Sequence, residues 1–145
     1  MQALPHHYNV QVNSTPDSQL IASSKGIPDL VVAGPAEFDG PGDQWSPETL
    51  LLSAVANCFV LSFKAVANAS KFAWEEIHCE STGKLEKVDR LMKFTQITTK
   101  VRLVIKDETE KEMALKLLKK SEAICLVSNS LNCELKLECD IVTGA

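Results

Sequence analysis

Two cysteines are the residues of this sequence whose type and setting could do chemistry. Cys58 lies within a long apolar segment, and Cys125 lies far downstream, just before the sequence Leu-Val-Ser-Asn-Ser. A thiolate is a nucleophile that peroxides oxidise, and a second thiol nearby converts the oxidised form into a disulfide. The pair therefore indicates redox chemistry. The alternative interpretation of Cys58 is a small buried residue of a helix.

The other three cysteines favour structural roles. Cys133 and Cys139 belong to the apolar row of one predicted strand, where six residues of extended chain, about 20 Å, separate them. Cys79 lies in another predicted strand and is left undecided, with a structural role favoured. No Cys-x-x-Cys or His-x-His pair is present, and His6-His7 is typical of a solvated pair, so we predict no metal site.

Composition limits the classes of function. The 145 residues are 45% hydrophobic and 23% charged, which suits one compact domain over residues 1–145 or a pair of subunits that share a core. A net charge of −4 without any basic run predicts no nucleic-acid partner. The first residues lack the pattern of a signal peptide, and five cysteines without one indicate a reducing, cytoplasmic location.

The pattern of apolar residues predicts an α+β chain. Residues 8–32 have the pattern of short strands, and residues 33–45 form a Gly/Pro-rich loop long enough to suggest a function. Ser46 and Pro47 begin a helix that continues to about residue 69. Its apolar side chains lie all round, which predicts burial on nearly every side. A membrane span is the rival interpretation, and the polar residues within the segment argue against it.

The second half of the chain is predicted to alternate strands and a helix. Residues 72–106 have the pattern of two or three strands around a charged hairpin. Asp107 is predicted to cap the next helix, with Glu110 completing a capping box. The last strand is the clearest, since the apolar residues from Cys133 to Ile141 alternate with charged ones.

Three motifs carry a resemblance to a known family. The segments are Pro35-Ala36-Glu37-Phe38-Asp39-Gly40-Pro41-Gly42, then Ser46-Pro47-Glu48-Thr49-Leu50-Leu51 with Ala54-Val55-Ala56-Asn57-Cys58-Phe59, and finally Cys125-Leu126-Val127-Ser128-Asn129-Ser130-Leu131. In this order they resemble the OsmC/Ohr family, the osmotically induced and organic hydroperoxide resistance proteins. The resemblance spans nearly the whole chain. One departure is Leu126, where the family usually has proline.

The resemblance implies a fold and an activity. The fold is α+β, with antiparallel sheets around two long helices in an intertwined homodimer. Active members of the family are thiol peroxidases that prefer organic hydroperoxides, with Cys58 at the peroxidatic position and Cys125 at the resolving position. Glu48 stands where the family has a carboxylate that partners an activating arginine. A dithiol or lipoyl reductant recycles the disulfide, and no cofactor is used.

One feature departs from the active members of the family. Their activating arginine lies in the N-terminal strands, whereas this chain has no arginine before Arg90. Lys25 is the only lysine or arginine ahead of the helix, and a solvated role is the simpler interpretation of it. Three functions therefore stay open: an organic hydroperoxide reductase, a relative without efficient peroxidase activity that binds a small apolar ligand or senses redox state, and a structural dimer.

Glu48 also bears on the oligomeric state. It precedes Cys58 by ten residues on one predicted helix, which is roughly 15 Å of rise. A glutamate side chain cannot cross that distance. If Glu48 serves a site at Cys58, it comes from a partner subunit or acts through an intermediary, and we therefore expect an obligate homodimer.

Overall fold

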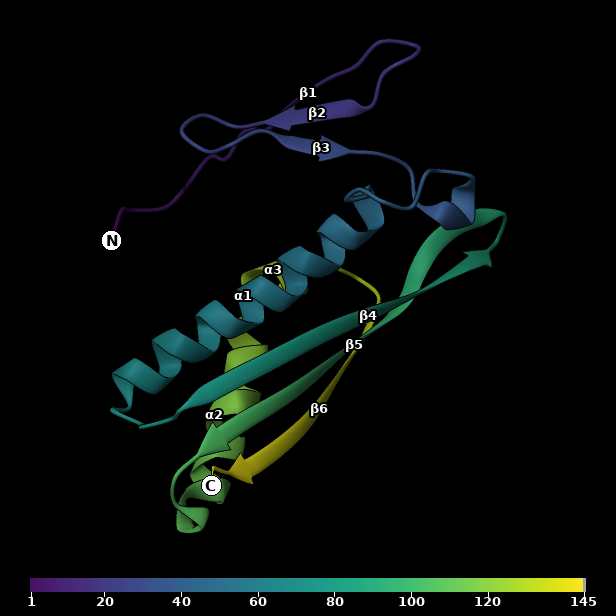
Figure 1. Ribbon diagram of the computed structural model, residues 1–145. Helices are drawn as coiled ribbons and strands as arrows, with labels where there is room; N and C mark the ends of the chain where they lie inside the picture. The colour runs from purple at the N-terminus through teal and green to yellow at the C-terminus, as the bar shows by residue number, and fades with distance from the viewer. Residues whose placement is uncertain (145) are drawn as a thin grey trace. The chain divides into compact units, whose positions relative to one another are not determined.

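The computed structural model describes residues 1–144 and divides the chain into two compact units, Met1–Leu50 and Leu51–Ala145. The first unit contains an antiparallel sheet of three short strands in the order β1 (Gln11–Asn13), β2 (Leu20–Ser23) and β3 (Leu30–Val32). Figure 1 shows these strands in purple and blue. They confirm the short strands predicted between residues 8 and 32.

The Gly/Pro-rich loop after β3 folds tightly on itself. It contains the 3-10 turn η1 (Ala36–Phe38), and the Gly40 N–H donates to the carbonyl oxygen of Pro35 at 2.9 Å. A side chain at Gly40 would collide with the backbone of Gly34. Glycine is therefore required at this close approach of two backbone segments.

Helix α1 (Pro47–Ala69) begins where the sequence predicts it. The Ser46 hydroxyl accepts from the Thr49 N–H at 3.1 Å, and the Thr49 hydroxyl accepts from the Ser46 N–H at 2.9 Å. This reciprocal cap satisfies two backbone donors at the helix start. By length and composition α1 also suits a membrane span, a property that helices at the centre of a protein core share.

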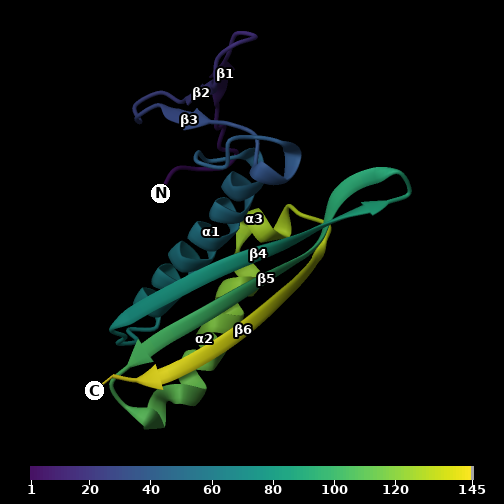
Figure 2. The same cartoon turned by 45° about the vertical axis from the view of Figure 1, so that its right-hand side comes forward.

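The second unit is a three-stranded sheet with helices on one face. Two long strands, β4 (Glu76–Val88) and β5 (Leu91–Ile105), form an antiparallel hairpin, and β6 (Glu134–Thr143) pairs with β5. Between them the chain forms η2 (Glu108–Glu110), α2 (Lys111–Ile124) and the single turn α3 (Leu126–Asn129). Figure 2 shows α1 and α2 on the same side of this sheet.

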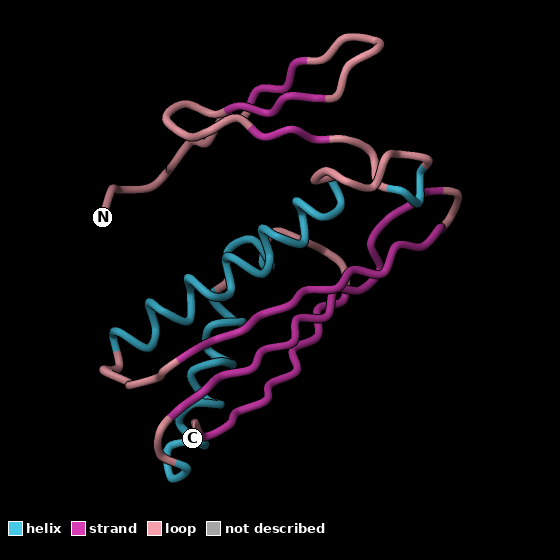
Figure 3. Tube along the Cα trace, in the orientation of Figure 1, coloured by secondary structure: helices cyan, strands magenta, loops and turns pink. Residues whose placement is uncertain are grey.

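The core of this unit lies between the helices and the sheet. Alternate residues of each strand point inward, so that Ile77, Leu103 and Ile141 form one cross-strand row, and Cys79, Val101 and Cys139 form the next. Phe59 and Phe63 of α1 pack against this face together with Leu117 and Leu118 of α2. The core thereby fixes both helices relative to the strands. Figure 3 traces the strands in magenta.

Three details differ from the prediction. The sheet of the second unit is mixed, because β6 runs parallel to β5: the crossover through α2 returns the chain to the starting end of β5. Asp107 caps the 3-10 turn by accepting from the Thr109 N–H at 2.9 Å, and α2 begins only at Lys111. The prediction of a capping box between Asp107 and Glu110 is therefore wrong, since Glu110 makes no side-chain capping bond.

The third difference concerns the burial of α1. Its buried residues, Val55, Phe59, Phe63, Val66 and Ala67, follow one stripe along the helix. The apolar residues on its other sides are half-buried or exposed, and Leu61 is 67% exposed. The prediction that α1 is buried on nearly every side is therefore wrong for a single chain.

We expect Phe63→Ala to lower the free energy of unfolding by about 3–5 kcal/mol, because a cavity replaces a large core side chain. Phe63 is fully buried and makes an edge-to-face contact with Trp74, with ring centroids 5.5 Å apart. Urea unfolding at one fixed protein concentration, followed by far-UV circular dichroism, measures the change. The matched control is exposed Lys64→Ala. Equal small losses in both variants would contradict this account of the core.

Candidate active site: a thiol pair at a helix junction

Cys125 lies at the junction between α2 and α3. Its backbone leaves the helical conformation at ψ 103°, which ends α2 at Ile124. Its carbonyl then accepts from the Asn129 N–H at 2.9 Å, which begins the next turn. The junction buries the Cys125 side chain, which is only 1% exposed. The local turn therefore places a thiol inside the protein rather than at its surface.

Cys58 lies beside Cys125. It is half-buried on α1, one residue before Phe59, which anchors the helix in the core. The two thiols are close enough for the Cys58 side chain to act on the Cys125 pKa both by direct side-chain interaction and by its charge, and both effects raise that pKa. All five cysteines are free thiols. The structure thus brings together the two cysteines that the sequence singles out.

The surroundings of Cys125 favour its neutral form. Burial is the main cause that raises the pKa of this thiol, because an apolar environment disfavours the charged thiolate. The polar groups of Ser128, in its side chain and its backbone, act in the opposite direction. Both of these Ser128 groups, which favour the thiolate, are uncharged, so no cation contributes. The raised pKa of Cys125 therefore makes it a poor first attacker of a peroxide.

Cys79 is a third thiol near this pair. It lies on β4, on the sheet face that carries the helices, and packs against the core. Burial raises the pKa of Cys79 to about 11, and the charge of Cys125 adds to the rise. The two residues are 46 positions apart in the sequence, so local patterns do not relate them. The half-buried place of Cys79 against the core agrees with the structural role that the sequence favours for it.

Glu48 lies on the same helix as Cys58 but well before it. It occupies the first turn of α1, ten residues before Cys58. Its Oε1 atom is buried, and no group of the described residues bonds to it. A buried carboxylate oxygen without a donor is unfavourable, so this atom needs a partner that the described part of one chain does not supply.

Two polar residues that the sequence offers as helpers of Cys58, Asn57 and Lys25, have local surroundings of their own. Asn57 is exposed, and its amide donates to the backbone carbonyl of Ser53 at 2.8 Å and to the Ser53 hydroxyl at 3.0 Å. These two bonds span one turn of the helix and fix the Asn57 amide against Ser53. Lys25 lies exposed in the turn between β2 and β3. A solvated role for Lys25 is consistent with that position.

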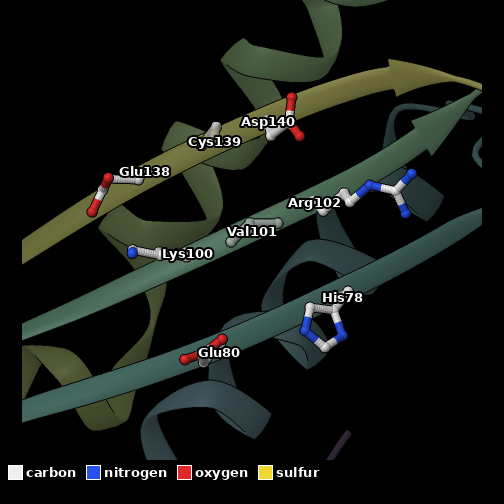
Figure 4. A pocket seen from close by; sticks show the side chains of 8 residues that line it. All are labelled: His78, Glu80, Lys100, Val101, Arg102, Glu138, Cys139 and Asp140. Carbon is white, nitrogen blue, oxygen red and sulfur yellow. The ribbon is translucent and has the colours of Figure 1, made fainter.

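A shallow pocket lies on the opposite face of the sheet. Its charged side chains form two cross-strand rows, shown in Figure 4: His78, Arg102 and Asp140 in one, and Glu80, Lys100 and Glu138 in the other. In each row the cation of β5 lies between side chains of the flanking strands, so the charges offset one another. Val101 and Cys139, which belong to the inward row, also line this pocket. Within residues 1–144 no group of three His, Cys, Asp or Glu side chains has the arrangement of a metal site.

The chain belongs to the OsmC-like protein family, whose model matches residues 40–140. The match covers α1, β4, β5, most of β6 and both cysteines of the pair. The match confirms the family membership that the three sequence motifs suggested. It also confirms the α+β fold class of that family for this chain.

Known relatives share most of their length with this chain. An uncharacterized protein of Bacillus subtilis (strain 168), YmaD, is 30% identical over 147 residues, which cover 96% of this chain and 97% of YmaD. An OsmC-like protein of unknown function from Vibrio cholerae has a similar structure, with a TM-score of 0.84 at 15% identity over 93% of this chain and 99% of that one. An organic hydroperoxide resistance protein from Legionella pneumophila has a TM-score of 0.75 at 21% identity, covering 97% and 99% of the two chains. At these identities the structural matches show the fold.

The raised pKa of Cys79 predicts how stability changes at alkaline pH. The unfolded thiol loses its proton near pH 9 and the folded one near pH 11, so this contribution to stability is complete below pH 9 and is lost as the pH rises towards 11. In reducing buffer, Cys79→Ala should therefore weaken the decline of the free energy of unfolding between pH 9 and 11. Urea unfolding across this range measures it. Parallel curves for both proteins would contradict the assigned burial of the thiol.

Proposed function

We propose that the protein is a thiol peroxidase that reduces organic hydroperoxides through the Cys58–Cys125 pair. The observation that carries the proposal is the contact between two thiols from segments far apart in the sequence, one half-buried on a helix and one buried at a helix junction. Membership of the OsmC-like family and the fold shared with an organic hydroperoxide resistance protein support it.

The chemistry follows from this arrangement. The Cys58 thiolate attacks the peroxide O–O bond, becomes a sulfenic acid and releases the alcohol. The Cys125 thiol then attacks the Cys58 sulfur, so that a disulfide forms and water leaves. The raised pKa of Cys125 disfavours its thiolate, so Cys125 competes little with Cys58 for the peroxide and gives up its proton as it attacks the sulfenic acid. A dithiol reductant, such as a lipoyl group, restores both thiols by exchange.

The apolar surroundings of the pair favour organic substrates. Cys58 lies among the apolar side chains of α1, and Leu61, one turn further on, is exposed. On the other side of the pair, Leu126 follows Cys125 directly and is also exposed. An alkyl group placed against these side chains gains apolar contacts that hydrogen peroxide cannot make.

A second function stays open because of the missing cation. No arginine precedes Arg90, and the Oε1 atom of Glu48 has no bonding partner in the described residues. A cation beside a thiol favours the reactive thiolate, so a site without one is expected to be slow. These observations favour a family member without efficient peroxidase activity, which binds a small apolar ligand or senses redox state through the same two thiols.

We further propose that the working form is a homodimer. Only one stripe of α1 is buried within the chain, and the apolar residues on its other sides need cover. A second copy can provide that cover and can also provide the missing partner of Glu48. In this arrangement Glu48 serves the site of the neighbouring subunit, since its own Cys58 is roughly 15 Å further along the helix.

We expect Cys58→Ser to abolish the consumption of cumene hydroperoxide with dihydrolipoamide as reductant, because the attacking sulfur is lost. Cys125→Ser should retain about one turnover and then accumulate sulfenic or sulfinic acid at Cys58. Peroxide assays and intact-protein mass spectrometry measure the two results.

Cys133→Ser is the matched control, since it removes a half-buried thiol just before β6. It should behave as the parent protein does. Unchanged peroxide consumption by Cys58→Ser would refute the proposed role of that residue. A parent protein that consumes no hydroperoxide, yet binds an apolar ligand after Cys58 is alkylated, would favour the second function.

We expect Leu61→Lys to shift the protein from dimer to monomer, because a buried lysine in the interface costs far more than an exposed one. Leu91→Lys is the control, since Leu91 at the hairpin end is 69% exposed and Leu61 is 67% exposed. Sedimentation velocity at micromolar concentration separates the outcomes. A folded parent monomer, or equal behaviour of the two variants, would refute the proposed interface.

A further inference from the structure

The solvent-facing side of α2 combines lysines with an apolar side chain at its end. Lys116, Lys120 and Ile124 follow one another at intervals of four residues, so they share one face of the helix. All three are exposed, and Lys119 beside them is exposed as well. We call the surface formed by Lys116, Lys119, Lys120 and Ile124 the lysine face.

The lysine face is positively charged in an acidic protein. Helix α2 contains four lysines and two glutamates, whereas the whole chain has a net charge of −4. Glu112 lies in the first turn of α2, and Glu122 is half-buried. The ion pairs within the described part of the chain include none of Lys116, Lys119 and Lys120. Their charges are therefore open to a partner.

The lysine face ends at the buried thiol of the pair. Cys125 directly follows Ile124 and is 1% exposed, whereas Ile124 is 48% exposed and Leu126, on the other side, is 70% exposed. The Asn129 side-chain amide donates to the Ala123 carbonyl oxygen at 3.0 Å, a bond that spans the junction of α2 and α3. Two exposed apolar side chains thus flank the buried thiol in the chain, and the lysines precede it within roughly three helical turns.

We propose that the lysine face docks an acidic protein segment that carries the dithiol which reduces the Cys58–Cys125 disulfide. The inference rests on the proposed peroxidase function. A thiolate of the partner attacks one sulfur of the disulfide, and the other sulfur leaves as a thiolate and takes up a proton. The second thiol of the partner then displaces the remaining cysteine. The partner's dithiol is thereby oxidised to a disulfide as both cysteines are reduced.

Charge complementarity selects the partner. Exposed lysines attract carboxylates before contact and raise the rate of encounter. The net negative charge of the chain disfavours approach of an acidic segment elsewhere, so the lysine face directs it towards Cys125. Ile124 adds an apolar contact within a charged rim, as is typical of protein interfaces. A small uncharged dithiol gains nothing from the lysines.

The first experiment compares two peptides that carry dihydrolipoyl-lysine, one flanked by aspartates and one by serines, as reductants in the cumene hydroperoxide assay. At low salt, Lys116→Glu/Lys120→Glu should raise the KM for the aspartate peptide about tenfold and leave that for the serine peptide nearly unchanged. High salt should reduce the difference, because it screens exposed charges.

Lys87→Glu/Lys93→Glu is the matched control, because it changes the net charge equally on the exposed β4–β5 hairpin. It should keep a KM close to that of the parent for both peptides. An equal rise in both double variants, or no rise in either, would overturn the docking site. If the serine peptide still supports hydroperoxide consumption in that case, the peroxidase function stands.

A second experiment does not depend on peroxidase activity. The aspartate peptide is made with octanoyl-lysine, which has no thiols, and its binding to the reduced protein is followed by fluorescence anisotropy. We expect weaker binding by Lys116→Glu/Lys120→Glu than by the parent and the hairpin control. Equal binding by all three proteins would refute the inference. Sedimentation velocity should show the same oligomeric state in all three, and a change confined to Lys116→Glu/Lys120→Glu would instead assign the lysine face to contact with a second copy.

Discussion

The packing of α1 and α2 against one face of the β4–β5–β6 sheet is the constraint on which the site depends. Phe59 and Phe63 anchor α1, and Leu117 and Leu118 anchor α2, in the same core. Because α2 ends at Ile124, this packing fixes where the chain turns at Cys125. Cys58 lies next to one of the α1 anchors, so the contact of the two thiols follows from the packing of the helices.

Much of this arrangement could be predicted from the sequence. Ser46 and Pro47 marked the start of α1 through local capping chemistry, and the alternation after Cys133 marked β6. The family motifs pointed to the cysteine pair. The parallel pairing of β6 could not be predicted in the same way, because the pattern of one strand carries no information about the direction of its neighbour. The start of α2 differs from the prediction, because Asp107 caps the 3-10 turn that precedes the helix.

The site itself was less predictable than the elements that form it. The contact of Cys58 with Cys125 depends on the path of the α2–α3 junction against α1, which short-range patterns do not determine. Ser128, which opposes the rise of the Cys125 pKa, stood within a family motif but without a recognised role. The burial of α1 on all sides was predicted from its composition, whereas a single chain buries only one stripe. The remaining apolar surface is the reason for proposing a second copy.

The central claim is that Cys58 and Cys125 form a redox pair. The most direct measurement adds one equivalent of cumene hydroperoxide to the reduced parent protein, blocks free thiols within seconds and maps the linked peptides by mass spectrometry. We expect the first bridge to appear to join Cys58 and Cys125, with Cys133 and Cys139 alkylated throughout. A first bridge that involves Cys133 or Cys139, or no bridge while the hydroperoxide is consumed, would contradict it.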